Sequence, residues 1–169
     1  MVVEVMGRYG GWIALHVGVA GGADVILITE IPFDLGSGAP CIRERDAAGA
    51  RFSIVVVAEG AHALGGRRSL VAEASENRAE RLGGAADGIA YQLAQLTGKE
   101  TRAVVLGQVQ RGGAAIELLR RKRFGVMVAN HPPNVVPVPL ADVVGRKKRV
   151  PLDYDLLLTA RSLGISFGD

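Results

Sequence analysis

The sequence predicts an α/β protein with a mostly parallel β-sheet and helices on both faces. Several short runs are aliphatic and β-branched throughout, the pattern of strands buried on both faces of such a sheet. Each run stops at or next to a glycine or a charged residue, and segments with apolar residues at helical spacing lie between the runs. Hydrophobic residues make up 49% of the 169 residues, and 23 glycines come in addition. This composition fits a covered sheet, and it equally fits an incomplete fold that is part of a larger protein.

The first third of the chain predicts alternating strands and helices. Residues 1–5 form a strand, a glycine-rich turn follows, and residues 12–20 carry apolar side chains at helical spacing. Residues 23–29 form a second strand, so a βαβ unit with a right-handed crossover accounts for this part. Residues 34–51 are rich in Gly, Ala, Pro and alternating charge and are interpreted as a loop. A third buried strand covers residues 52–58.

The remaining elements follow from the same patterns. No firm structure is assigned to residues 62–82. The predicted elements after them are a helix over 88–96 that starts at Asp87 or the glycines before it, a buried strand over 102–106, a helix over 114–128, a short strand over 135–140, a polar connection over 142–149 and an amphipathic helix over 153–163.

Polar residues follow three of the predicted strands: Met6-Gly7-Arg8, Glu59, and the stretch from Gln108 to Arg111. Ligands of open α/β sheets bind beyond the carboxyl ends of the strands. The glycine turn after the first strand directs N–H groups and the positive end of the helix dipole toward that edge, so a phosphate or carboxylate is the expected ligand. Two arginines with a glutamate suit a sugar phosphate. The same residues also fit turns with a solvated arginine and an exposed loop glutamate.

Other functional classes are disfavoured by the sequence. Basic runs at 120–123 and 146–149 lack the interleaved aromatic residues that stack on bases, so no nucleic acid is expected. No apolar run approaches the roughly 18 to 20 residues of a membrane span. The lone Cys41 agrees with a reducing, cytoplasmic location, and three scattered histidines give no metal-binding pattern. The net charge of +3 suits a phosphorylated ligand and nucleic acid alike.

Six segments of the chain resemble, in order and spacing, the carboxyl-terminal half of 6-phosphofructokinases, and the likeness is greatest to the subgroup whose phosphoryl donor is ATP or pyrophosphate. These segments are residues 3–8, 11–15, 20–28, 54–60, 98–102 and 105–113. The resemblance implies phosphoryl transfer, with Mg²⁺, to the 1-hydroxyl of fructose 6-phosphate, which gives fructose 1,6-bisphosphate in glycolysis. It also implies a substrate-binding domain over residues 1–113, and over residues 114–169 helical segments that complete it or bridge to a donor-binding domain.

The resemblance assigns roles to the residues at the predicted edge. Met6, Gly7 and Arg8 correspond to the family's turn that holds fructose 6-phosphate, and Glu59 to the glutamate that binds the sugar hydroxyls. Arg102 corresponds to an arginine that reaches the sugar phosphate in a neighbouring subunit's site, which implies a cytoplasmic homo-oligomer with shared active sites.

The loop ending at Gly113 completes the implied substrate site. Gln110 and Arg111 match the family's glutamine and arginine, and Arg111 contributes to the same substrate. Gln108 stands where the family usually has histidine. Because an amide cannot carry charge, we expect this difference to cost about 1 kcal/mol in phosphate binding. The region after Gly113 is shorter than the family pattern.

The family's glycine-rich donor loop and its catalytic aspartate segment have no counterpart in residues 1–169. Phosphoryl transfer needs an aligned nucleophile and a neutralised donor. We therefore expect a fragment or a truncated gene that lacks kinase activity alone; the alternative to an enzyme half is an inactive fragment that binds sugar phosphate. Turnover of fructose 6-phosphate by the isolated chain in a coupled assay would contradict this expectation.

Overall fold

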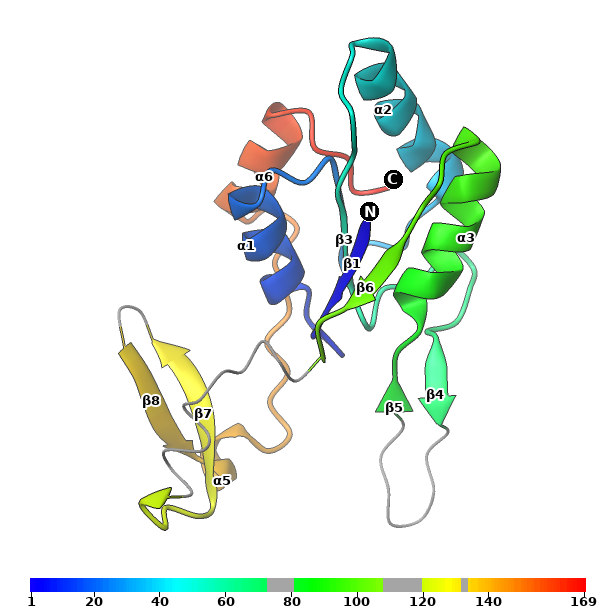
Figure 1. Ribbon diagram of the computed structural model, residues 1–169. Coiled ribbons are helices and arrows are strands. Elements are labelled where there is room, and N and C mark those ends of the chain that lie inside the picture. Colours follow the sequence, from blue (N-terminus) through cyan, green and yellow to red (C-terminus); the bar gives the residue numbers. More distant parts are fainter. Residues whose placement is uncertain (73–80, 108–119, 132–133) are drawn as a thin grey trace. The chain divides into compact units, whose positions relative to one another are not determined.

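Four parallel strands form the central sheet, in the order β2-β3-β1-β6 (Figure 1). They are β1 (Val2–Val5), β2 (Val25–Leu27), β3 (Val55–Ala58) and β6 (Ala103–Val105). The structure is a computed structural model that describes residues 1–72, 81–107, 120–131 and 134–169. The chain divides into two units, one formed by Met1–Gly107 with Lys148–Asp169 and the other by Gln108–Lys147. The sheet belongs to the first unit, and the predicted fold class is confirmed.

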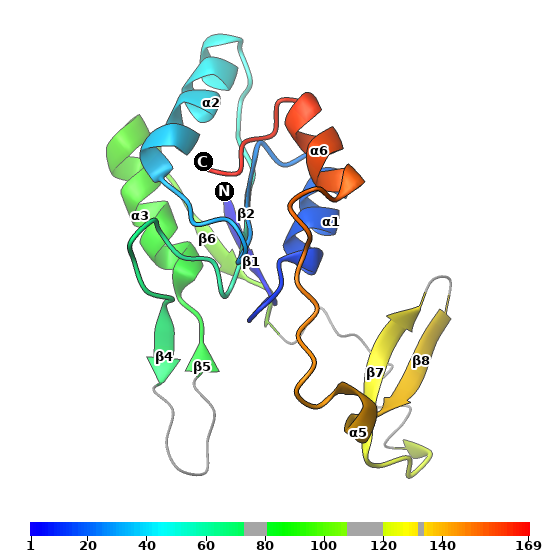
Figure 2. The ribbon, with the colours of Figure 1, turned by 180° about the vertical axis from the view of Figure 1, so that it is seen from behind.

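Helices cover both faces of this sheet, as the two opposite views show (Figures 1 and 2). Helices α1 (Trp12–Ala20) and α6 (Asp155–Ser162) lie on one face, and α2 (Leu35–Ala47) and α3 (Ala85–Thr97) lie on the other. The two faces have separate hydrophobic cores. Leu15, Ile26 and Phe167 are fully buried in the first, and Leu27 and Val57 are fully buried in the second.

The order of the strands explains why the helices separate in this way. The chain moves two places along the sheet from β1 to β2 and then reverses, through β3, to β6. Since crossovers between parallel strands are right-handed, a reversal of direction places the next helices on the opposite face. The connections that leave the carboxyl ends of the adjacent strands β1 and β3 therefore diverge to opposite faces. This is the topological switch point at which α/β sheets bind ligands.

Two predictions about the sheet unit are corrected by the structure. Residues 34–51 are not a loop, because α2 occupies most of them and Asp34 caps it by accepting a hydrogen bond from the Gly36 N–H at 3.0 Å. Strand β6 is not buried on both faces, because it lies at the sheet edge and leaves Val104 and Val105 40% and 53% exposed. The predicted βαβ unit is confirmed, because β1 and β2 are parallel strands of one sheet joined by α1, with β3 between them.

Two antiparallel strand pairs lie outside the central sheet. In the first unit, β4 (Leu70–Ala72) pairs with β5 (Arg81–Leu82), where no firm structure was predicted. In the second unit, β7 (Val126–His131) pairs with β8 (Asn134–Pro139), and α5 (Leu140–Val143) follows. The predicted helix over 114–128 is therefore wrong at 126–128, and its residues 114–119 lie outside the described part. The strand predicted over 135–140 is confirmed by β8. The division of roles between residues 1–113 and 114–169 stays a prediction, although residues 148–169 belong to the sheet unit.

A buried carboxylate links the sheet to the start of α3. Glu4, in the middle of β1, is only 3% exposed, and its Oε2 accepts a hydrogen bond from the Ala86 N–H at 2.9 Å. The residue before the helix is Gly84, which has no side chain to cap the first turn, so Glu4 supplies the acceptor from another element. Burial is the main cause that raises the pKa of Glu4; the Ala86 N–H opposes this, and the carboxylates of Glu59 and Asp87 raise the pKa further.

This pKa predicts how a Glu4→Gln substitution affects stability. A carboxyl group with a raised folded-state pKa binds more protons in the folded than in the unfolded chain, so its contribution to stability falls as the pH rises above its ordinary pKa of 4.5. Glutamine cannot ionise and escapes this loss. We expect the free energy of unfolding of the variant, measured in urea relative to the wild type, to improve as the pH rises above 4.5 and to level off once the pH exceeds the raised folded-state pKa. A difference that does not change with pH contradicts the assignment.

Candidate functional site

The carbonyl group of Gly7 brings together the carboxyl ends of three strands. It accepts a hydrogen bond from the Thr29 hydroxyl, beyond β2, at 2.8 Å, and another from the Gly60 N–H, beyond β3, at 3.2 Å. Glu59 is aligned by its own N–H, which donates to the carbonyl of Val5 at 2.9 Å. A long contact of 3.4 Å joins the Gly7 N–H to Glu59 Oε1. The turn after β1 and the residues after β3 therefore form one structure at the switch point.

Glycine is required at position 60 by this close approach. A Cβ atom built on Gly60 lies 2.2 Å from the carbonyl oxygen of Arg8 and 2.7 Å from that of Gly7. Both obstacles are backbone atoms, which cannot rotate away. The glycine after Glu59 thus lets the β3 loop pack against the Met6-Gly7-Arg8 turn.

The amino end of α1 is occupied by a carboxylate of the chain itself. The Gly11 N–H donates to both carboxylate oxygens of Glu30, at 3.1 and 3.0 Å, and the Val150 N–H donates to Glu30 Oε1 at 2.7 Å. The anion expected at this helix terminus is therefore Glu30, which follows β2. Trp12 adds a further link to the same segment, because its indole N–H donates to the Lys148 carbonyl at 3.0 Å.

The predicted site residues fall into three groups in the structure: one at the carboxyl edge, one outside the described residues, and Arg102 by itself. Met6, Gly7, Arg8 and Glu59 lie together at the carboxyl edge, where all four are partly buried. Gln108, Gln110 and Arg111 lie outside the described residues.

Arg102 lies apart from the carboxyl edge. It immediately precedes β6, at the amino ends of the strands, and its carbonyl accepts a hydrogen bond from the Val2 N–H at 2.8 Å. Its guanidinium forms an ion pair with Glu100 at 2.8 Å, and the two side chains are 80% and 76% exposed. Within one chain, Arg102 and Arg8 are therefore at opposite ends of the sheet.

Sequence reasoning missed one residue at the carboxyl edge. The guanidinium carbon of Arg68, in the loop between β3 and β4, lies 5.0 Å from the centre of the Tyr9 ring. Such a cation–π contact is worth about 0.5–1 kcal/mol at an exposed site. The only signal in the sequence is the pair Arg67-Arg68 after two glycines, in a segment without helical or strand periodicity.

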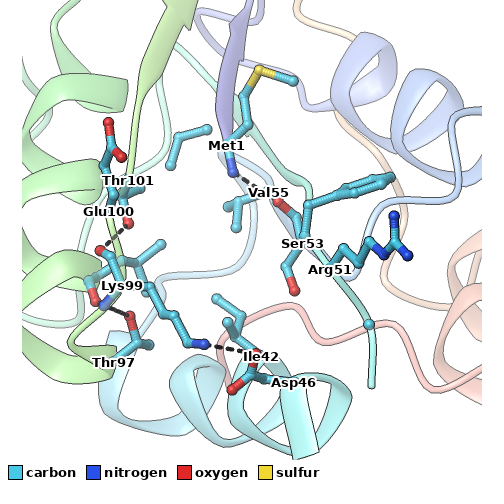
Figure 3. Close-up of a pocket in the computed structure, with 14 residues that line it drawn as sticks. Met1, Ile42, Asp46, Arg51, Ser53, Val55, Thr97, Lys99, Glu100 and Thr101 are labelled. Atoms are coloured by element: carbon cyan, nitrogen blue, oxygen red, sulfur yellow. Dashed lines mark hydrogen bonds and ion pairs between the residues drawn. The ribbon is translucent and has the colours of Figure 1, made fainter. Parts of the chain in front are cut away.

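A pocket of about 300 Å³ lies at the other end of the sheet (Figure 3). Its lining includes Met1, Val2 and Val55, at the amino ends of β1 and β3. Two of its charged groups have partners within the lining, since Lys99 pairs with Asp46 at 2.7 Å and the amino terminus donates to the Ser53 carbonyl at 2.7 Å (Figure 3 labels these residues). Because ligands of such sheets bind at the carboxyl ends, we assign the candidate site to that edge and not to this pocket.

No group of three His, Cys, Asp or Glu side chains in the described part of the chain is arranged to hold a metal ion. Of the helices that the structure describes, none has both the length and the apolar character needed to cross a membrane.

The fold and the switch point define an α/β protein whose candidate ligand site lies beyond the carboxyl ends of a parallel sheet. Solved structures share this fold. A pyrophosphate-dependent phosphofructokinase from Marinobacter aquaeolei has a TM-score of 0.55 and 23% identity, over 99% of this chain and 48% of that one. The phosphofructokinase of Saccharomyces cerevisiae has a TM-score of 0.54 and 25% identity, over 83% of this chain and 20% of that one.

Sequence comparison identifies the family. The profile described as "Phosphofructokinase" matches residues 1–131. The whole chain aligns at 50% identity with the ATP-dependent 6-phosphofructokinase of Chloroflexus aggregans, and at 43% with that of Spirochaeta thermophila, covering 50% of each. The chain belongs to the phosphofructokinase family, as the resemblance indicated. It spans about half the length of the curated relatives that it matches.

The close packing at Gly60 predicts a large cost for Gly60→Ala. The added methyl group meets backbone oxygens, so we expect the free energy of unfolding in urea to fall by roughly 1–3 kcal/mol. Gly88→Ala is the matched control, because its Cβ meets nothing within 4 Å; inside helix α3 it is expected to stabilise by about 0.5–1 kcal/mol. Equal effects of the two substitutions contradict the packing described for the edge.

Proposed function

We propose that this chain supplies the fructose 6-phosphate site of an enzyme that phosphorylates the sugar's 1-hydroxyl and gives fructose 1,6-bisphosphate, a step of glycolysis. The observation that carries the proposal is the junction of the Met6-Gly7-Arg8 turn with Glu59 at the switch point, in a chain of the phosphofructokinase family.

The chemistry of the edge suits this substrate. A carboxylate accepts hydrogen bonds only, and Glu59 is therefore assigned to the sugar hydroxyls. Arg8 supplies a guanidinium, which binds phosphate oxygens in a bidentate manner. The backbone contacts at Gly7 fix these two residues relative to each other, which reduces the ordering that substrate binding requires.

Arg102 is assigned to the substrate of a neighbouring subunit in a homo-oligomer. Its position at the amino ends of the strands keeps it away from the edge of its own chain. Its exposed ion pair with Glu100 is of a kind that contributes little to stability, so exchange of that partner for a phosphate is inexpensive. Gln108, Gln110 and Arg111 are proposed to complete the site, with Gln108 as a neutral donor.

The phosphoryl donor is proposed to be ATP or pyrophosphate together with Mg²⁺. The curated relatives are named as ATP-dependent, and the Marinobacter aquaeolei structure is titled pyrophosphate-dependent. When bound, the metal neutralises charge on the transferred phosphoryl group. The residues described here bind and orient the acceptor sugar.

Calorimetric titration of the chain with fructose 6-phosphate tests the proposal. We expect Glu59→Gln to weaken binding about tenfold or more, because a hydrogen bond to a charged group is worth roughly 1.5–3 kcal/mol. Glu44→Gln on the exposed side of α2 makes the same chemical change away from the edge and is expected to leave the affinity unchanged. No measurable binding by the wild type, or equal affinities for both variants, contradicts the proposal.

A further inference from the structure

The loop that follows β3 is held against the β1 turn at two points. At its start, Gly60 contacts the backbone of Gly7 and Arg8. Near its end, the guanidinium of Arg68 lies over the ring of Tyr9, the residue next to Arg8. The second contact places a cationic side chain beside the turn that carries the proposed substrate site. The loop is therefore attached to the turn through its backbone at Gly60 and through the Arg68 side chain near its end.

The hydrogen-bonding capacity of Arg68 remains available in this arrangement. A cation–π contact uses the charge of the guanidinium and occupies none of its N–H donors. None of the carboxylates in the described ranges forms an ion pair with Arg68. The side chain is also partly buried, as is Tyr9. Arg68 is thus a partly buried cation whose donors can bind a ligand.

The local charge favours an anion as the partner of Arg68. From Gly60 to Ala72 the loop and β4 contain two arginines and no acidic residue. The turn that Arg68 contacts adds Arg8, and the carboxylate of Glu59 contacts the same turn from the start of the loop. Arginines therefore outnumber carboxylates across the loop and the turn. Planar donors in a positive environment match the oxygens of a phosphate monoester.

We propose that Arg68, held by Tyr9, is a further phosphate-binding residue at the carboxyl edge and contacts a phosphate group of the bound sugar phosphate. This inference rests on the proposed function and extends its site to the loop between β3 and β4. Arg68 is a substrate-contacting residue that acts alongside Arg8, and Tyr9 is its positioning residue.

The neighbouring arginine provides a matched control for the test. Arg67→Gln removes the same formal charge from the same loop, but Arg67 is exposed and makes no described contact with the turn. We expect Arg68→Gln to weaken fructose 6-phosphate or fructose 1,6-bisphosphate binding about tenfold in calorimetric titration of the chain, and Arg67→Gln to change it less than twofold. Arg68→Lys is expected to recover part of the loss, because it restores charge without the planar donors.

Titration with both fructose 6-phosphate and fructose 1,6-bisphosphate identifies which phosphate group Arg68 contacts. If Arg68→Gln binds both sugars more weakly by the same factor, Arg68 contacts the 6-phosphate. If it binds only fructose 1,6-bisphosphate more weakly, Arg68 contacts the 1-phosphate. Either result supports the inference. Thermal unfolding of Arg68→Gln should match that of Arg67→Gln, which separates lost binding from lost folding. Unchanged affinities for both sugars, or equal losses in both variants, overturn the inference and leave the proposed function intact. No binding of either sugar by the wild type overturns both.

Discussion

The arrangement of the sheet edge depends on one carbonyl group, that of Gly7. Its two hydrogen bonds come from the residues that follow two other strands, so the ends of β1, β2 and β3 are connected at a single atom. Hydrogen bonds of this kind contribute about 1 kcal/mol each, but an unsatisfied buried carbonyl costs more than that. The position of Glu59, which precedes one of the donors, follows from this network. The site is therefore determined by backbone geometry before any ligand binds.

The strand order places the connected ends of β1 and β3 at the switch point of the sheet. Reversal of the chain direction after β2 sends α2 and α3 to the face opposite α1. Because right-handed crossovers leave no other packing for these helices, the loops after β1 and β3 diverge from two strands that are themselves adjacent. Glu4, which binds the start of α3 from within β1, shows that the same geometry is supported beneath the edge by a buried polar contact.

Sequence patterns predicted the parts of the structure that repeat a local rule. The aliphatic runs before Met6 and Glu59 are buried strands, and α1 has the predicted bounds. Helix α2 was missed because its glycines and Pro40 disguise a helix that Asp34 caps. The exposure of Val104 was missed because position in a sheet is a tertiary property. The partnership of Glu30 with the start of α1 joins residues distant in the chain, and periodicity carries no information about it.

The contact between Glu30 and Gly11 has a consequence for how the site evolves. A backbone source of positive potential near the edge, the start of α1, is already neutralised by Glu30. Attraction for an anion must then come from guanidinium side chains. Salt screens their charge, and each can be replaced by a single substitution. A single arginine substitution can therefore change how strongly this edge attracts an anion while the backbone stays as it is.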